Sequence, residues 1–150
     1  MSALGVQMVA RAMTRNQKSF PIESLGDADA AEMLELAKLT RPGPFRARTH
    51  ALGRFVGVRD NGKLVAMAGE RLRTEEFIEI SAVCTHPDCR GRGYGAALMR
   101  TVGARILADG ATLHVIHDED PNAAAKLATV CVPLLYRRMV DLLADPAHLP

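Results

Sequence analysis

The length and composition of the chain are those of one globular domain. It has 150 residues, 48% of them hydrophobic and 24% charged, and its formal net charge at pH 7 is +2. Such a length is enough to bury a core, so we expect residues 1–150 to form a single domain. The small net charge, with only four Phe and two Tyr, argues against nucleic acid as a main partner.

No segment predicts a membrane span, a secretion signal or a metal site. The chain has no apolar run long enough to cross a bilayer, and its first residues lack a basic segment followed by an apolar stretch. Its cysteines, Cys84, Cys89 and Cys131, contain no Cys-x-x-Cys pair. We therefore expect a cytoplasmic protein with reduced thiols and no membrane partner, in which Cys84 is a small buried residue of a strand.

The first part of the chain predicts a strand and a helix. Residues 6–12 can form a short first strand. Asp29 and Glu32 have the spacing of a helix-capping box, and the helix that follows must end before Pro42 and Pro44. The apolar face predicted for this helix comprises Met33, Leu34, Leu36, Ala37 and Leu39.

Three antiparallel strands are predicted next. Residues 55–60 and 63–71 are separated by Asn61 and Gly62, the pair that best tolerates a type I′ turn. The second strand reaches to about Arg73 and turns into a third strand over residues 77–85. The period of two in this third strand predicts one shared face for Ile78, Ile80, Ala82 and Cys84.

A glycine-rich segment then leads into a second helix. We call this segment the glycine loop; it reads Arg90-Gly91-Arg92-Gly93-Tyr94-Gly95. The helix continues to about residue 108, with Leu98, Val102 and Ile106 on its apolar face, and Gly110 ends it. Residues 111–117 form a further strand, which a right-handed crossover places parallel to residues 77–85. The order of elements predicts a mixed α/β fold with a mostly antiparallel sheet and helices on both faces.

The glycine loop has the features of an anion site. Where a strand feeds a helix, unpaired backbone N–H groups and the helix dipole point at the same place. Glycines at positions 91, 93 and 95 allow positive φ angles and a close approach of the main chain, and Arg90 and Arg92 add charge that suits a diphosphate with an adjacent 3′-phosphate. The alternative is a tight strand-to-helix turn whose arginines are only solvated.

Other phosphate ligands fit the loop less well. Gly91, Gly93 and Ala96 also satisfy the loose dinucleotide fingerprint, with an acid available in residues 118–120. That fingerprint belongs in the first turn of a parallel sheet, however, and here antiparallel strands precede it. A phosphate loop of the NTPase type is excluded, because it requires Lys followed by Ser or Thr after the last glycine.

At these residues the chain resembles the GNAT superfamily of N-acetyltransferases. The motif of that family is Gln or Arg, two residues, Gly, one residue, then Gly or Ala, which Arg90 to Gly95 match. Residues 79–89 look like the central strand of the family, and the resemblance extends from about Ala51 to Ala125. It implies a GNAT-like fold, acetyl-CoA as acyl donor, and a primary amine of a small molecule or peptide as acceptor.

The resemblance also implies a set of cofactor-binding residues. The main chain of residues 83–85 would bind the pantetheine arm where two strands of the family splay apart, and one of these amides would polarise the thioester carbonyl. Asn122 matches an Asn of the family that often contacts the cofactor, although a plain helix cap explains it equally well. The full set is Val83, Cys84, Thr85, Arg90, Gly91, Arg92, Gly93, Tyr94, Gly95, Ala96 and Asn122.

The sequence offers a candidate base, Glu79, with Glu70 as an alternative. Acetyl transfer to an amine needs a base for the ammonium proton and an acid for the departing thiolate. Glu79 stands where some family members place a catalytic glutamate; the alternative is a solvated strand residue, and Glu70 is a weaker rival for the base. His50 and His86 are expected to be structural or surface residues.

The C-terminal part departs from the family. The family places its acidic tyrosine in the helix that follows the Asn, whereas the first tyrosine after Asn122 here is Tyr136, a displaced equivalent. Pro133 and the spacing of Leu135, Met139 and Leu142 instead favour a helix over residues 133–144 that packs in the core or in a homodimer, in place of the terminal strand pair of the family. This departure leaves a second function open, a non-catalytic acyl-CoA-binding or protein-interaction module.

Overall fold

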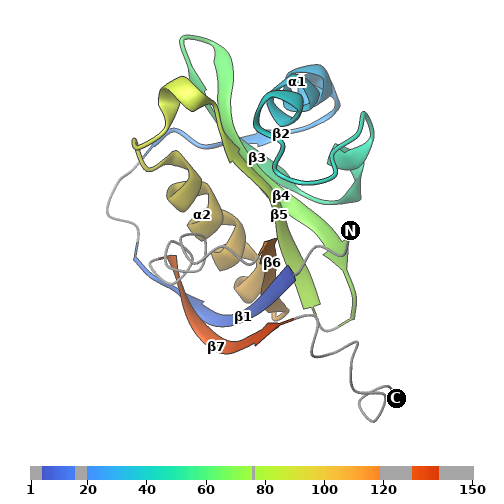
Figure 1. Ribbon diagram of the computed structural model, residues 1–150, viewed down its shortest axis with the longest axis vertical. Coiled ribbons are helices and arrows are strands. Elements are labelled where there is room, and N and C mark those ends of the chain that lie inside the picture. The colour runs from blue at the N-terminus through green and yellow to red at the C-terminus, as the bar shows by residue number, and fades with distance from the viewer. Residues whose placement is uncertain (1–4, 16–19, 76, 119–129, 139–150) are drawn as a thin grey trace.

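Seven strands form one mixed sheet in the computed structural model, which describes residues 5–15, 20–75, 77–118 and 130–138. The strand order is β2-β3-β4-β5-β6-β1-β7, and among these strands only β5 and β6 run parallel (Figure 1). The strands are β1 (Gly5–Met13), β2 (Glu23–Leu25), β3 (Phe55–Asp60), β4 (Lys63–Arg73), β5 (Phe77–Thr85), β6 (Thr112–Asp118) and β7 (Cys131–Arg138), and the helices are α1 (Ala30–Thr40) and α2 (Tyr94–Ala108). The mixed fold predicted from the sequence is therefore confirmed.

The central hairpin has the predicted turn. Asn61 and Gly62 both have positive φ angles, 50° and 80°, as a type I′ turn requires. The antiparallel pairing of β3 with β4 and of β4 with β5 is confirmed, as are the first strand, β1, and the parallel strand β6. The three-residue strand β2 was not predicted, because so short a segment carries no periodicity.

Two apolar cores lie on the two faces of the sheet. Figure 1 shows α2 across the β5, β6 and β1 region and α1 beside β3 and β4. The predicted apolar residues of α2, Leu98, Val102 and Ile106, are all fully buried. In α1 the prediction is partly wrong, because Leu39 is 54% exposed. The buried α1 residues are Met33, Leu36 and Ala37. No helix in the described ranges is both long and apolar enough to cross a membrane.

A bulge in β5 overturns the single face predicted for that strand. Met67 pairs with Cys84 and Gly69 with Ser81, so β5 carries one residue more than β4 between these pairs. Ala82 takes up the extra residue with a left-handed φ of 54°. As a result, Ile78 and Ile80 pack in the α2 core, whereas Ala82 and Cys84 pack in the α1 core.

The helix predicted for residues 133–144 is wrong over the residues that the structure describes. Residues Cys131–Arg138 form strand β7, which pairs antiparallel with β1. Pro133 lies at an irregularity of this pairing, opposite Ala10, and β7 is an edge strand, where a missing N–H is tolerated. The partner that decides the structure is the N-terminal strand, which no local pattern in this segment reveals. Positions 139–144 lie outside the described residues.

Arg59 ties α1 to the sheet. Its guanidinium group bonds Asp29 at 2.6 Å and Glu32 at 2.9 Å, and it also contacts Glu23. The predicted capping box is therefore wrong: the Asp29 carboxylate accepts from the Gly26 amide, and Glu32 accepts from the backbone N–H of Leu64 and from Arg59. These hydrogen bonds, first from Leu64 and then from Arg59, lower the pKa of Glu32 below 4.5.

Replacing Arg59 tests this network. We expect Arg59→Ala to lower the free energy of unfolding by about 1–2 kcal/mol, because several carboxylates lose a shared partner at once. The exposed pair of Lys38 with Glu35 is the control, and Lys38→Ala should cost less than about 0.5 kcal/mol. Since the folded-state pKa of Glu32 is lowered, its contribution is present above pH 4.5 and is lost as the pH falls through that lowered value. Urea titrations over a range of pH measure both effects; equal losses in the two variants would contradict the network.

Candidate functional site

The parallel strands β5 and β6 part at the centre of the sheet. Their pairing runs from Phe77 and Thr112 to Ile80 and Val115, and there it stops, although both strands continue. Beyond this point, residues 81–85 lie beside β4 on one side, and no described strand pairs with them on the other. Backbone groups on that side are available to a ligand, as predicted for a splayed strand pair.

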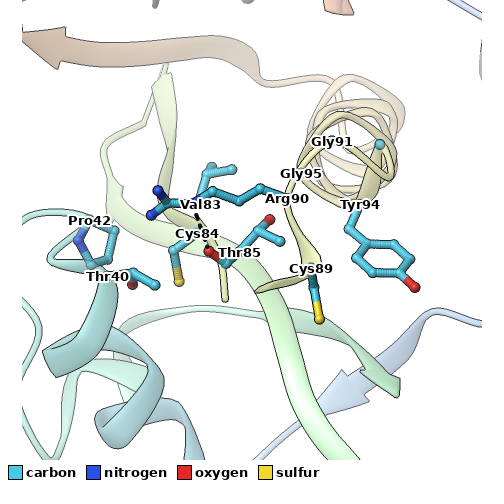
Figure 2. Close-up of a pocket in the computed structure, with 11 residues that line it drawn as sticks. Thr40, Pro42, Val83, Cys84, Thr85, Cys89, Arg90, Gly91, Tyr94 and Gly95 are labelled. Atoms are coloured by element: carbon cyan, nitrogen blue, oxygen red, sulfur yellow. Dashed lines mark hydrogen bonds between the residues drawn. The ribbon is translucent and has the colours of Figure 1, made fainter. Parts of the chain in front are cut away.

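A pocket of about 520 Å³ lies along this part of β5. Figure 2 shows its three walls: β5 in the middle, the glycine loop with the start of α2 on one side, and the end of α1 on the other. The lining residues are Thr40, Pro42, Val83, Cys84, Thr85, Cys89, Arg90, Gly91, Gly93, Tyr94 and Gly95. The pocket thus joins the predicted anion site to the unpaired edge of β5.

The glycine loop presents backbone amides that have no acceptor among the described residues. Hydrogen bonds within α2 begin with the amide of Ala97, which donates to the carbonyl of Gly93. No described residue accepts a hydrogen bond from the amides of Gly93, Tyr94 or Gly95, so they and the helix dipole favour an anion. Gly91 and Gly93 have φ angles of 77° and 95°. The positive φ predicted for Gly95 is wrong, since that residue is an ordinary part of the helix.

The two arginines of the glycine loop have different surroundings. Arg90 lies over the pocket, and its Nε donates to the carbonyl of Thr85 at 3.4 Å (Figure 2). Arg92 instead forms an ion pair of 2.9 Å with Asp60 in the β3–β4 hairpin, and hydrogen bonds to Tyr94 and to Asp60 raise its pKa. Arg90 is thus the arginine of the loop that lines the pocket, while Arg92 links the loop to the sheet.

Glu79 is buried on the α1 face of the sheet. It lies between Ile78 and Ile80, which face the α2 core, so its side chain points to the opposite side. It is 3% exposed and forms an ion pair of 3.1 Å with Arg71, which also donates to the carbonyl of Pro44. The solvated strand residue considered as an alternative is therefore excluded.

His114 is the neighbour of Glu79 on the next strand. The two residues are directly paired across β5 and β6, and His114 is 5% exposed. Burial lowers the pKa of His114 below 6.5, and the charge of Glu79 opposes this shift. Burial therefore favours the neutral form of this imidazole.

Glu70 has surroundings unlike those of Glu79. It is 2% exposed and its carboxylate bonds the guanidinium groups of Arg54, Arg73 and Arg105 at 3.0 to 3.1 Å. Arg105 belongs to α2, so Glu70 faces the α2 side of the sheet, away from Glu79. Glu70 therefore links β4 to the residue that precedes β3 and to the last part of α2.

Comparisons with known proteins agree with this geometry. The chain matches the GNAT acetyltransferase family over residues 12–128. A crystal structure from Novosphingobium aromaticivorans, described as an acetyltransferase of this family, is 36% identical and aligns with a TM-score of 0.81 over 91% of this chain. The chain belongs to the GNAT acetyltransferase family. It spans about 60% of the length of the Novosphingobium protein.

Two further structures share the fold of this GNAT chain. A GNAT-family acetyltransferase from Colwellia psychrerythraea is 15% identical with a TM-score of 0.75, and the match covers 91% of this chain and 55% of that one. The ribosomal-protein-S18-alanine N-acetyltransferase of Escherichia coli is 20% identical with a TM-score of 0.62, and the match covers 73% of this chain and 74% of that one. No curated protein sequence matches the chain.

The GNAT chain brings most of the predicted cofactor-binding residues together. Eight of them line the pocket, namely Val83, Cys84, Thr85, Arg90, Gly91, Gly93, Tyr94 and Gly95. Arg92 and Ala96 lie beside the pocket without lining it, and Asn122 lies outside the described residues. Sequence reasoning missed Thr40, Pro42 and Cys89 in the lining, and also Arg71 and His114. Among these residues only Pro42 gave a signal in the sequence, and it was interpreted as a residue that ends the helix.

Tyr136, the predicted acid, lies in β7 and pairs with Met8 of β1. Because β6 and β1 stand between β5 and β7, Tyr136 belongs to the third strand from β5 in the sheet. Its assignment as the acid stays a prediction.

Cys84 is predicted not to act as a nucleophile. Burial raises the pKa of its thiol from 9.0 to about 11, so the thiolate is scarce at neutral pH. We expect slow alkylation of Cys84 by iodoacetamide in the folded protein, with the rate rising as the pH approaches 11. The unfolded chain ionises first, so stability is full below pH 9.0 and falls as the pH rises toward 11. Mass spectrometry locates the label, and fast labelling of Cys84 at neutral pH would contradict this assignment.

Proposed function

We propose that this GNAT chain transfers an acetyl group from acetyl-CoA to a primary amine by direct attack on the thioester. The observation that carries the proposal is the continuous pocket between the unpaired amides of the glycine loop and the unpaired side of residues 81–85. A cytoplasmic location and a homodimer stay predictions.

The residues of the pocket suit the parts of the donor in order. The amides of Gly93, Tyr94 and Gly95 would hold the diphosphate, with Arg90 supplying charge. A Cβ added at Gly91 would meet nothing within 4 Å, so the loop leaves open space beside its backbone. The main chain of residues 83–85 would bind the pantetheine arm, and one of its amides would polarise the thioester carbonyl. When bound, acetyl-CoA supplies the activated acetyl group.

Glu79 is our proposed base. The ammonium group of the acceptor loses its proton, its nitrogen forms a bond to the acetyl carbon, and the C–S bond breaks to leave a thiolate that takes up a proton. Glu79 would receive the first proton, through a water molecule because its carboxylate is buried. Arg71 orients this carboxylate through one oxygen, at 3.1 Å, and His114 lies beside it.

The burial of Glu79 also supports a second candidate function. Its ion pair with Arg71, which holds the carbonyl of Pro44, explains the residue as a structural link between β5, β4 and the segment after α1. In that case the protein is a non-catalytic acyl-CoA-binding or interaction module. Isothermal titration with acetyl-CoA, followed by thiol release against a panel of amines, separates the two functions. Tight binding without turnover on any amine would favour the module.

Gly93→Asp tests the donor site. The substitution places a negative charge where the diphosphate is expected, so we predict a loss of acetyl-CoA affinity of at least roughly 100-fold, or about 2.8 kcal/mol. Gly110→Asp is the matched control: Gly110 also has a positive φ, 79°, and lies at the other end of α2 with open space around it. Both variants should lose a similar stability of about 1 kcal/mol, but only Gly93→Asp should lose binding. Equal affinity in the two variants would exclude the glycine loop as the diphosphate site.

Glu79→Gln tests the base. We expect kcat to fall by roughly 100-fold or more at neutral pH while the affinity for acetyl-CoA is unchanged, because the carboxylate acts on the acceptor. Thiol release measured with a reactive disulfide reports the rate, and thermal unfolding shows whether the variant is folded. A folded variant with full activity would remove Glu79 from the mechanism. In the same assay, Tyr136→Phe tests the predicted acid.

A further inference from the structure

An uncompensated basic segment follows α1. Between Glu35 and Asp60 the chain has six Lys and Arg residues and no Asp or Glu. Three of these cations have acid partners: Lys38 pairs with Glu35, and Arg54 and Arg59 pair with carboxylates of distant segments. The other three are Arg41, Arg46 and Arg48, all exposed in the segment of residues 41–48, which we call the basic loop. Within the described part of the chain, no carboxylate pairs with them.

The basic loop borders the pocket on the side away from the glycine loop. Thr40, just before it, and Pro42, within it, line the pocket (Figure 2). The carbonyl of Pro44 accepts from Arg71, whose second nitrogen holds the Glu79 carboxylate at 3.1 Å. One guanidinium group therefore separates the backbone of the basic loop from the proposed base.

Contacts with the rest of the protein hold the backbone of the basic loop in place. The ring of Phe45 packs edge-on against Phe55 of the α1 core, with centroids 5.9 Å apart. The amide of Arg46 donates to the hydroxyl group of Thr49, which is buried. These contacts fix the backbone from which the exposed side chains of Arg46 and Arg48 extend.

Arg41 ends α1 in a conformation that suits glycine. Its φ and ψ angles are 50° and 57°, the left-handed region in which a side chain is strained. Glycine is the usual residue at such a position, and an arginine there adds strain without forming an ion pair among the described residues. Residues held in strained conformations cluster at functional sites, where the side chain has a use that offsets the strain.

We propose that the basic loop selects an acceptor that carries a carboxylate group near its reactive amine. This inference rests on the proposed function and names the class of its acceptor. The carboxylate of the acceptor would lie against Arg41, Arg46 and Arg48, while its ammonium group lies toward Glu79 on the other side of Arg71. Opposite charges at the two ends of the acceptor would then orient it across the pocket mouth. The positive charges of the same loop would repel a cationic acceptor.

The first experiment compares acceptors that differ in charge. The C-terminally amidated dipeptides Glu-Ala, Gln-Ala and Lys-Ala, in which the side chain alone sets the charge beside the reactive amine, test the peptide form of the acceptor, and free glutamate tests the small-molecule form. We expect kcat/KM to be at least about tenfold higher for Glu-Ala than for Lys-Ala. In the double variant Arg46→Gln/Arg48→Gln, the value for Glu-Ala should fall by about tenfold, while that for Gln-Ala changes by less than about twofold.

Matched variants show that charge at this place is the cause. Arg46→Lys/Arg48→Lys keeps the charge and should restore most of the preference for Glu-Ala. Arg15→Gln removes an exposed arginine that follows β1 and should leave every acceptor unchanged. Arg41→Gly should raise the melting temperature by relieving strain and lower kcat/KM for Glu-Ala by about threefold. Rates that do not depend on the charge of the acceptor would overturn the proposal.

A binding measurement separates this inference from the proposed function. Isothermal titration of the CoA-loaded protein with Glu-Ala, at low and high salt, requires no turnover. Binding that is lost in Arg46→Gln/Arg48→Gln supports the basic loop as a carboxylate site even if no amine is acetylated. Two outcomes overturn the inference: affinity for acetyl-CoA that falls in parallel, which assigns the loop to the phosphates of the donor, and an oligonucleotide that binds through these arginines while Glu-Ala does not.

Discussion

The parting of β5 from β6 is the constraint on which the pocket depends. Parallel strands normally satisfy each other's backbone groups, so two strands that separate in mid-sheet leave one edge without partners. The bulge at Ala82 lies where they separate, and it turns Val83 toward α2 and Cys84 toward α1. Gly95 then fits close to β5, since a Cβ added there would lie 3.6 Å from the Thr85 hydroxyl oxygen. One extra residue in β5 thus shapes both sides of the cleft.

Strand β4 fixes the two layers that form the pocket walls. Its neighbouring residues Glu70 and Arg71 point to opposite faces of the sheet. Glu70 binds Arg105 near the end of α2, and Arg71 binds Glu79 and the segment that follows α1. Because both links start from adjacent backbone positions, a shift of either layer is opposed by a charged contact in a buried setting. Strand β4, which lies beside β5, therefore helps to position both walls.

Sequence reasoning succeeded where local physics decides the structure. Asn61 and Gly62 determine the turn between β3 and β4. The apolar spacing of α2 defines the helix, and Gly110 marks its end. These elements were therefore predicted with nearly correct bounds. Sequence reasoning failed where a partner far away along the chain determines the structure of a segment. Strand β7 forms because residues 131–138 meet the N-terminal strand, more than a hundred positions away along the chain, and Pro133 alone suggests a helix. The bulge in β5 failed for a similar reason, since period-two counting cannot detect an extra residue that its partner strand defines.

The donor side of the site could be predicted from the sequence, whereas the acceptor side could not. A diphosphate is held by backbone amides, and backbone geometry restricts the residue type, so Gly91 and Gly93 with their positive φ angles leave a short motif in the sequence. An acceptor is held by side chains on segments that come together only in the fold, as Arg71 and Glu79 do across two strands. Such residues carry no spacing rule, because the sheet and not the chain sets their separation. The chemistry of the acceptor is therefore inferred from the fold, through the charges of Arg41, Arg46 and Arg48 that no described carboxylate pairs with.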